Sequence, residues 1–265
     1  AIAARVQNVL TYGKEHYNGE FTSEETLKNV TLQDVINHYN TYFVPSNAYL
    51  VVIGDVKTAD VKKKVEELFG ADVWKKATAP NLTYNDPKDL QYSQINFVDV
   101  PNAVQSEIAL INLSKLKMND KDYFAAILAN QILGGGGEGR LFLNLREKHG
   151  WTYGSYSNLG ASKYISKFSS TASVRNAVTD SAVVEIFNEL RKIRTDLVSE
   201  EDLKNAKAKY IGNFVMQIEK PATIARYALN IKTLGLPEDF YENYVKNINA
   251  VTPEDVRNAA KKYFL

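Results

Sequence analysis

Two stretches of this sequence repeat each other, and the repeat limits how the chain can be divided. Thr31–Phe43 aligns without gaps with Thr252–Phe264, and the two share Thr, Asp, Val, Asn, Tyr and Phe at equivalent places. Each copy begins with Thr followed three residues later by Asp, a pairing that satisfies free N–H groups at a helix N-terminus. A capped helix start followed by valine also arises by chance. If the similarity is not due to chance, the repeat indicates two related domains, each of which ends with the same helix.

The repeat also predicts where the domains meet. The first copy runs on into an apolar stretch, whereas the second copy stops. Residues 1–70 are then the C-terminal part of a first α+β domain, and residues 89–265 are a second domain that lacks its last strand. Residues 71–88, which hold two prolines and little periodicity, fit a linker. We expect a fragment of a longer protein, in which residues 1–70 associate with the second domain or with a partner.

Helices and strands alternate in groups along the sequence. Hydroxyl or amide residues with an acid three positions later mark helix starts at Asn119, Ser199 and Thr252. Stretches rich in β-branched and aromatic residues and bounded by turn residues predict strands. These are residues 93–100, 104–114, 151–160 and 165–174, with residues 48–53 as a further strand buried on both faces and 56–69 as the helix after it. Strand pairs between groups of one-sided helices predict an α+β fold with a largely antiparallel sheet.

The composition argues against several classes of function. Thirty-two basic and 31 acidic residues leave a net charge of +1, which is too small for non-specific nucleic-acid binding. No apolar run approaches the ~18 residues of a membrane span, so we expect no membrane insertion. Cysteine is absent, which excludes disulfides and thiolate metal sites but fits a reducing or an oxidising compartment equally well.

One motif carries most of the functional information. Residues 133–155 read LGGGGEGRLFLNLREKHGWTYGS, with Arg146 near a helix end and Tyr153 on the strand that follows. This run resembles the second domain of pitrilysin/insulinase-type zinc metallopeptidases, the inverzincins. Residues 42–55 resemble the closing strand of the family's first domain, and residues 12–19 resemble its Tyr-Gly stretch. The resemblance thus covers nearly the whole chain.

The resemblance implies a fold and a metal. The fold would be pairs of α+β domains, each a mixed sheet with helices on one face, and two such halves would close like a clamshell around an unfolded peptide. The family's zinc site is an inverted His-x-x-Glu-His motif with a further glutamate from a later helix. This sequence lacks the motif, and its only histidines, His16, His38 and His149, are far apart in the sequence. We therefore expect no metal in this chain, zinc in the complete enzyme, and no peptide hydrolysis by the chain alone.

Two explanations of the missing motif stay open. In the family, the motif and the distal glutamate both precede the Tyr-Gly stretch, so in an intact enzyme they would lie upstream of Ala1. Alternatively, the parent protein is one of the family's non-catalytic partner subunits, or a purely structural assembly module. Arg146 and Tyr153 do not separate these explanations, because partner subunits often keep both residues. The resemblance also suggests a bacterial periplasm or cell envelope.

Arg146 and Tyr153 are the candidate catalytic residues. The resemblance implies that they face the zinc-bearing domain and hydrogen-bond the substrate backbone and the scissile carbonyl, where fixed donors stabilise a developing oxyanion. Spacing alone favours an exposed helix-end cation for Arg146 and an ordinary strand aromatic for Tyr153, and only the resemblance favours the functional roles. The partners that follow are an extended peptide or unfolded polypeptide and a zinc-bearing domain of the same or another chain. A homo-oligomer is also compatible with the sequence.

Gly134, Gly135, Gly136 and Gly137 are the candidate substrate-binding residues. A phosphate-binding loop does not fit, because no Gly-Lys-Ser/Thr follows and the dinucleotide-binding pattern lacks its preceding strand. Two interpretations stay open. The glycines form either a turn that lets the next helix approach the sheet or a loop that gives way to a bound peptide, as the family suggests.

Overall fold

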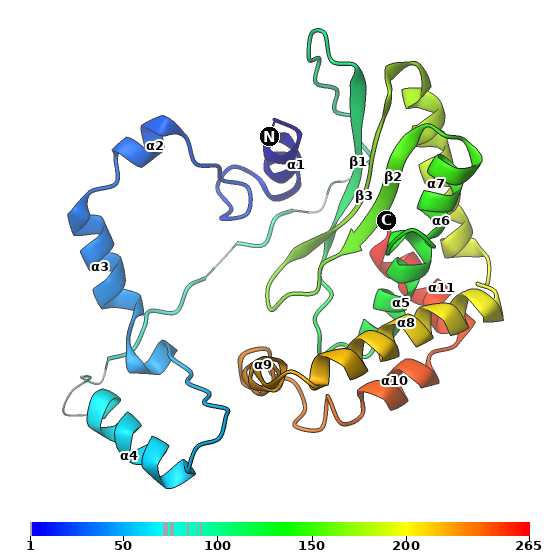
Figure 1. The fold of residues 1–265 in the computed structure, drawn as a ribbon. Helices are drawn as coiled ribbons and strands as arrows, with labels where there is room; N and C mark the ends of the chain where they lie inside the picture. Colours follow the sequence, from blue (N-terminus) through cyan, green and yellow to red (C-terminus); the bar gives the residue numbers. More distant parts are fainter. Residues whose placement is uncertain (1, 71–73, 75–76, 84, 89, 91) are drawn as a thin grey trace.

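The protein consists of a body built around one sheet and an arm of short helices (Figure 1). The computed structural model describes residues 2–70, 74, 77–83, 85–88, 90 and 92–265. The arm comprises α2 (Glu24–Lys28), α3 (Leu32–Tyr42), the 3₁₀ turn η1 (Pro45–Asn47) and α4 (Thr58–Phe69), and it follows α1 (Ile2–Tyr12). The body comprises β1 (Gln105–Ser114), α5 (Tyr123–Gly134), α6 (Arg140–Phe142), the π-helical turn η2 (Leu143–Lys148), β2 (Thr152–Leu159), β3 (Ser166–Arg175), the 3₁₀ turn η3 (Asn176–Val178), α7 (Thr179–Thr195), α8 (Glu200–Ile218), α9 (Pro221–Thr233), α10 (Tyr244–Ala250) and α11 (Pro253–Tyr263).

The sheet has three antiparallel strands in the order β1-β3-β2. β1 pairs with β3 along its whole length. β2 pairs with the other edge of β3, with Ser155 opposite Ala172 and a bulge between Thr152 and Ser155. The α+β prediction is confirmed, and three of the predicted strands, residues 104–114, 151–160 and 165–174, agree with the structure to within a residue or so at each end.

Helices α5, α7 and α11 cover one face of the sheet and form the core with it. Alternate residues of β3, including Phe168 and Val174, point to this face and are buried. Phe264, which follows α11, is fully buried and stacks on Phe168 with ring centroids 4.4 Å apart. α5 is apolar on nearly every side and is the most central helix, as expected of a helix surrounded by protein.

The opposite face of the sheet is contacted by α1 near one end of β1 and β3. Lys167 alternates with the buried Phe168 and therefore points away from the helix layer. Its Nζ donates to Asn8 Oδ1 on α1 at 2.8 Å. Burial under α1 lowers the pKa of Lys167, because a desolvated ammonium group is less stable than an exposed one.

Helix capping confirms the repeat seen in the sequence. Thr31 and Thr252 each form a reciprocal capping box, with Asp34 and Asp255 respectively. Ser199 accepts a hydrogen bond from a backbone N–H in the first turn of α8, as predicted. α3 and α11 therefore start in the same way and have the same length of 11 residues.

The helix start predicted at Asn119 is wrong. α5 begins at Tyr123, and Asp122 stands at its N-cap position without a side-chain bond to the helix. The Asp122 carboxylate instead accepts a hydrogen bond from Lys262 Nζ at 2.6 Å, which ties the start of α5 to the end of α11. Asp122 thus pairs with a lysine far away in the sequence and not with the backbone of its own helix. The local sequence pattern gives no sign of this long-range pair.

Two of the predicted strands are also wrong. Residues 48–53 and 93–100 have no strand partner in the described sheet. Residues 48–53 were expected to be buried on both faces, but Tyr49 and Leu50 are exposed, and Ile95 in the other stretch is 99% exposed. The pattern of side chains marks a segment that can be a strand, but a ladder forms only where a second strand is available.

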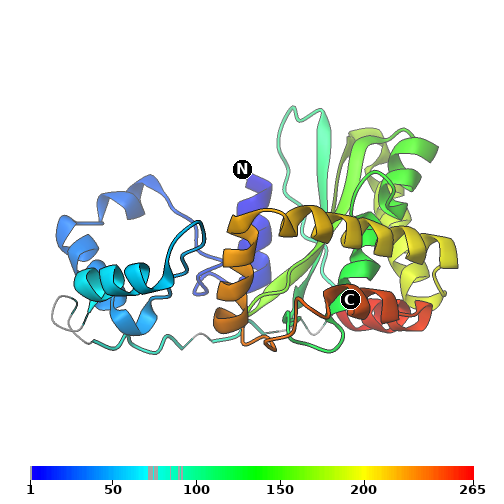
Figure 2. The ribbon, with the colours of Figure 1, turned by 60° about the horizontal axis from the view of Figure 1, so that its bottom comes forward.

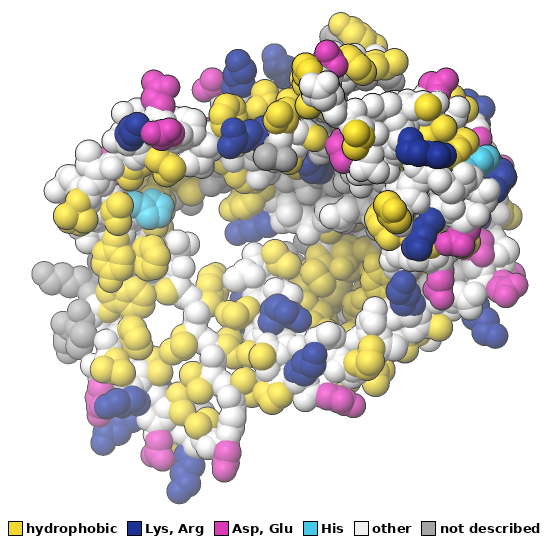
Figure 3. Space-filling view, turned by 45° about the horizontal axis from the view of Figure 1, so that its top comes forward, with side chains coloured by type: hydrophobic (Ala, Val, Ile, Leu, Met, Phe, Trp, Pro, Cys, Tyr) yellow, Lys and Arg dark blue, Asp and Glu magenta, His cyan; other side chains and the backbone are white. Residues whose placement is uncertain are grey.

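The arm leaves its apolar side chains open to solvent. No residue of α2, α3 or α4 is buried. Figure 3 shows hydrophobic side chains, in yellow, across the arm and in the hollow between the arm and the body. The helix predicted over residues 56–69 is confirmed as α4, but it has no core to pack on.

The predicted domain boundaries remain predictions. The linker expected at residues 71–88 falls partly outside the described residues, which omit 71–73, 75–76 and 84. Among the helices that the structure describes, none combines the length and the apolar character that crossing a bilayer requires.

Candidate functional site

Arg146 lies in the π-helical turn η2, which continues α6. A π turn widens the helix by one residue, and such turns recur at functional sites. Gly150 then reverses the chain with a left-handed φ of 63°, and its N–H donates to the Arg146 carbonyl at 2.9 Å. The N–H of Trp151 donates to the Leu145 carbonyl at 3.0 Å. The reversal satisfies carbonyls at the end of the helix and leads directly into β2.

The Arg146 side chain is half exposed, at 47%. Its guanidinium lies over the ring of Phe142, one helical turn earlier, at 4.8 Å from the ring centroid. Its Nε is 3.6 Å from the Glu147 carboxylate, beyond normal hydrogen-bond length. Phe142 is itself buried, and the face of its ring supports the guanidinium through a cation–π contact. Beyond the ion pair with Glu147 and the ring contact, no other partner of the Arg146 guanidinium is found among the described residues, and the half-exposed group can reach a ligand.

Tyr153 is on β2, at the bulge where the strand's register with β3 shifts. Its side chain is 87% exposed. Within the described residues its hydroxyl has no hydrogen-bond partner, and no direct contact joins it to Arg146. The structure therefore places both predicted residues at the protein surface, on a helix end and on the strand that follows, as the sequence predicted.

The four consecutive glycines occupy different environments. Gly134 is buried, and a Cβ there would lie 2.4 Å from the backbone nitrogen of Ser157, so α5 packs directly on β2. Gly136 has a φ of 149°, which other residues rarely adopt. Gly137 is exposed, and a Cβ on it would lie 3.8 Å from the Phe142 ring. Gly134 thus fits the close-packing interpretation, whereas Gly137 lies beside the ring that supports Arg146.

Sequence reasoning missed two aromatic residues of this surface. Phe142 contacts Arg146 and Tyr156, and its ring centroid lies 5.9 Å from that of Tyr156. Tyr156 is partly exposed and lies across Gly154, whose Cβ position would be 2.6 Å from the tyrosine hydroxyl. The spacing of four residues between Phe142 and Arg146 on one helix was the available signal. No local signal marked Tyr156.

A polar anchor fixes η2 on α7. The buried Asn144 donates through Nδ2 to Glu185 and to Glu189, each at 2.8 Å. Glu189 is also buried and pairs with Lys192 Nζ at 2.9 Å. The hydrogen bond from Asn144 lowers the pKa of Glu185, because it stabilises the ionised carboxylate. The helix turn that carries Arg146 is therefore held on both sides, by Phe142 and by Asn144.

The described part of the chain does not fit a zinc ion. His16 is buried between the rings of Tyr12 and Tyr17, and its Nδ1 accepts a hydrogen bond from the backbone of Asn18. His38 lies against Tyr42 on the same helix, α3, and His149 stacks on Trp151 in the connection between η2 and β2. Across the described residues, no three His, Cys, Asp or Glu side chains gather in a way that could hold a metal. Zinc ligands would have to come from outside these residues.

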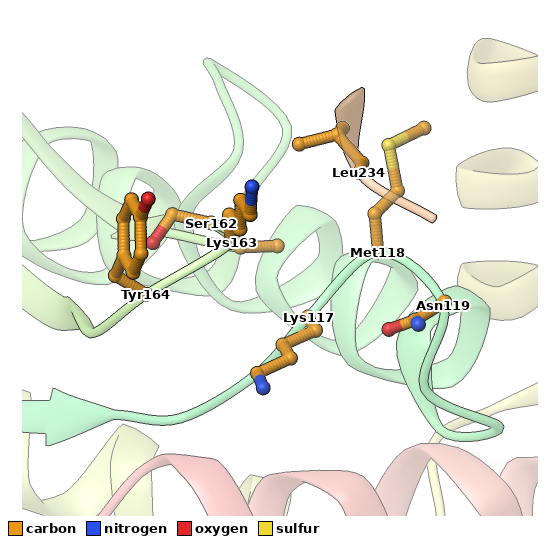
Figure 4. A pocket seen from close by; sticks show the side chains of 8 residues that line it. Lys117, Met118, Asn119, Ser162, Lys163, Tyr164 and Leu234 are labelled. Carbon is orange, nitrogen blue, oxygen red and sulfur yellow. The ribbon is translucent and has the colours of Figure 1, made fainter. Parts of the chain in front are cut away.

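A small depression of about 230 Å³ lies elsewhere on the body. Figure 4 shows it where the turn after β1, with Lys117 and Met118, meets the loop between β2 and β3, with Lys163, and Leu234 after α9. Neither Arg146 nor Tyr153 lines it, and no acid or histidine does. Its lining and its small volume do not fit the site that the sequence predicted.

Comparison with known proteins agrees with this picture. A family model described as the peptidase M16 inactive domain matches residues 29–210, which is more than half of the chain. A probable inactive metalloprotease of Bacillus subtilis, YmfF, is 24% identical over 93% of this chain and 56% of its own length. An uncharacterized zinc protease of the same bacterium, YmxG, is 23% identical over 91% of this chain and 57% of its own length.

The fold is also found in a solved structure. The crystal structure of a peptidase M16 inactive domain from Pseudomonas fluorescens superimposes with a TM-score of 0.88 at 22% identity, covering 99% of this chain and 62% of that one. The chain thus spans little more than half the length of the curated relatives it matches. Its sequence match over residues 29–210 and its fold together show that this chain belongs to the peptidase M16 family, as an inactive domain.

Proposed function

We propose that this chain is the substrate-holding half of a zinc peptidase, in which Arg146 and Tyr153 present hydrogen-bond donors to an extended peptide. One observation carries the proposal. Both side chains are exposed on adjoining elements; within the described residues, Arg146 has only an ion pair of 3.6 Å with the adjacent Glu147, and the Tyr153 hydroxyl has no hydrogen-bond partner. The Phe142 ring supports the guanidinium and the buried Asn144 amide fixes the turn that carries it, an arrangement that is suited to a ligand.

The chemistry of the two groups suits a peptide backbone. A guanidinium offers several N–H donors in a fixed plane, and a phenol offers one O–H, so together they can bind successive carbonyl oxygens. When the scissile carbonyl becomes tetrahedral, its oxygen gains charge, and a donor already in place then stabilises the transition state more than the substrate. Phe142 and Asn144 act as positioning residues for Arg146 in this proposal.

The zinc-bearing domain is the second part of the proposal. The described residues hold no zinc site, and the relatives that carry the name zinc protease are nearly twice as long as the matched region. The arm supports the same idea, because α3 and α4 expose apolar faces that a neighbouring domain would cover. In this proposal the arm completes the zinc-bearing domain, and the body closes on the peptide from the other side.

Substitution in the complete enzyme tests the proposal. We expect Arg146→Ala and Tyr153→Phe each to lower kcat/KM for peptide hydrolysis by on the order of 100-fold to 1000-fold, the usual cost of losing one such donor. Thermal unfolding should change little, because both side chains are exposed. Arg175→Ala, which removes an exposed arginine at the end of β3, is the matched control and should keep activity. Full activity in both site variants would overturn the proposal.

A second candidate is a non-catalytic subunit that serves an active partner chain. The name of YmfF, a probable inactive metalloprotease, favours it. In that case the parent protein with residues upstream of Ala1 would bind no zinc, whereas a complete enzyme would bind one ion per chain. Metal analysis of the purified parent protein decides between the two.

A further inference from the structure

A lysine of α8 lies against the glycine turn that follows α5. Lys209 Nζ is 3.0 Å from the position that a Cβ on Gly136 would take, so the ammonium group occupies the space that a side chain there would fill. The φ of 149° at Gly136 also disfavours any residue other than glycine. The glycine therefore leaves room for a positive charge that comes from a helix more than 60 residues further along the chain.

The packing of α8 fixes this position. Figure 2 shows α8 as a long helix, coloured yellow to orange, that extends along the body, where it contacts α5. Leu203 and Ala206 of α8 are buried in the core, and Lys209 follows Ala206 at helical spacing, on the side of the helix that faces the protein. Two turns before Lys209, the Asp202 carboxylate accepts a hydrogen bond from Arg140 Nη2 at 3.2 Å. Core packing and an ion pair therefore hold the helix that carries Lys209.

The Lys209 ammonium is a cation without an acid beside it. Within the described residues it forms neither an ion pair nor a hydrogen bond, although its side chain is partly buried. Glu138, the only acid of the glycine turn, is exposed and also lacks an ion pair in the described part of the chain. An anion gains more from a partly desolvated ammonium than from a fully hydrated one, because less water screens the pair. Lys209 is thus suited to an anionic group of a ligand.

The surface around Lys209 continues to Arg146. A Cβ on Gly137, the next residue of the turn, would lie 3.8 Å from the Phe142 ring, and the Arg146 guanidinium lies over that ring at 4.8 Å from its centroid. The whole chain has a net charge of only +1, so two cations this close to one turn are a local feature. An extended peptide advances roughly 3.3–3.6 Å per residue, so a peptide bound at Arg146 can reach Lys209 within about six residues.

We infer that Lys209 binds a carboxylate of the peptide, either an acidic side chain or the C-terminus, at a fixed number of residues from the part bound by Arg146. The inference rests on the proposed function, because it takes the ligand to be a peptide. An ammonium group has three donors and forms a charge-assisted hydrogen bond with a carboxylate. A backbone carbonyl is a poorer partner and is common to all peptides, so only a carboxylate makes Lys209 a determinant of specificity.

Anisotropy of labelled peptides bound to the complete parent protein, with a chelator present to prevent hydrolysis, tests the inference. One peptide series carries a single Asp at successive positions of an uncharged, C-terminally amidated peptide. A second series compares free and amidated C-termini in peptides of different length. We expect Asp at one position, or a free C-terminus at one length, to tighten binding by roughly fivefold, the upper range for a partly exposed ion pair. This gain should shrink as salt is added, because salt screens the pair.

Substitutions at Lys209 show whether it causes the preference. Lys209→Gln should abolish the gain from the carboxylate and leave the binding of neutral peptides unchanged, and Lys209→Glu should favour Lys over Asp at the same position. Lys207→Glu is the matched control with the same change of charge on α8, because the Lys207 ammonium donates to the Asn249 carbonyl at 2.9 Å, and it should keep the preference. The absence of any preference, a preference that survives Lys209→Glu, or one that Lys207→Glu also abolishes overturns the inference.

Arg146→Ala separates a failure of this inference from a failure of the proposed function. If Arg146→Ala binds every peptide as tightly as the wild-type protein does, the proposed function is wrong, and the inference is wrong with it. If Arg146→Ala weakens all the peptides, whereas Lys209→Gln weakens none of them or all of them equally, the proposed function stands and only the inference is wrong.

Discussion

At the scale of single residues, Gly150 links the two elements of the candidate site. Its φ of 63° turns the chain from η2 into β2, and nothing lies within 4 Å of the position that a Cβ would take. The cost of Gly150→Ala is therefore conformational only, and we expect a loss of about 1 kcal/mol in the free energy of unfolding. Gly212→Ala, in the interior of α8 and equally free of neighbours, should stabilise the protein by roughly 0.5–1 kcal/mol. Urea denaturation measures both, and equal signs for the two variants would contradict the explanation.

Glu185 gives a prediction at the same scale. Its pKa in the folded protein is lowered below the usual 4.5, mainly by the hydrogen bond from Asn144. Because the folded state then releases this proton more readily than the unfolded state, Glu185 adds stability above its unfolded pKa, and this stability is lost as the pH falls through the folded pKa. The free energy of unfolding should decrease below pH 4.5, and Glu185→Gln should make that decrease smaller. Identical pH profiles of the two proteins would remove Glu185 from the anchor.

At the scale of elements, α3 and α11 show how the same sequence pattern meets two environments. Phe264 is fully buried after α11, whereas the equivalent Phe43 after α3 is 59% exposed. We expect Phe264→Ala to cost about 3–5 kcal/mol and Phe43→Ala to change stability by less than about 0.5 kcal/mol. Chemical denaturation of the two variants provides the comparison. A large cost for Phe43→Ala would show that a neighbour covers the arm in solution.

The elements that the sequence predicted well are those whose signals are local. Capping boxes at Thr31 and Thr252 specify a helix start through bonds within one turn, and both are present in the structure. Residues 48–53 and 93–100 have the composition of strands, but a ladder needs a second backbone, which a one-dimensional pattern cannot supply. For Arg146 and Tyr153, the motif predicted a helix end and the strand that follows, and the structure has both; the functional role of the two residues stays a prediction. The support for Arg146 from Asn144, which depends on acids more than 40 residues away, had no signal in the sequence.

At the scale of the whole molecule, the protein should be unevenly stable. Isolated helices shorter than ~12–15 residues are marginal in water, and α3 buries no residue, whereas α11 buries four. We expect amides of residues 31–43 to exchange with deuterium on the order of 100-fold faster or more than those of residues 252–264. Mass spectrometry of the corresponding peptides measures the two exchange rates. The two helices have the same length and a similar sequence pattern, so each serves as the control for the other. Equal protection would mean that the arm does not stand open in solution.

The consecutive glycines 134–137 differ in how well their positions should tolerate substitution. Saturation mutagenesis should find position 134 intolerant even of a methyl group, since any larger side chain would push α5 away from β2. Position 136 should be restricted by its backbone angle, whereas 137, with open surroundings, should accept many substitutions. A lineage of such proteins can therefore reshape the rim beside Arg146 through position 137 while the spacing of its layers stays constant.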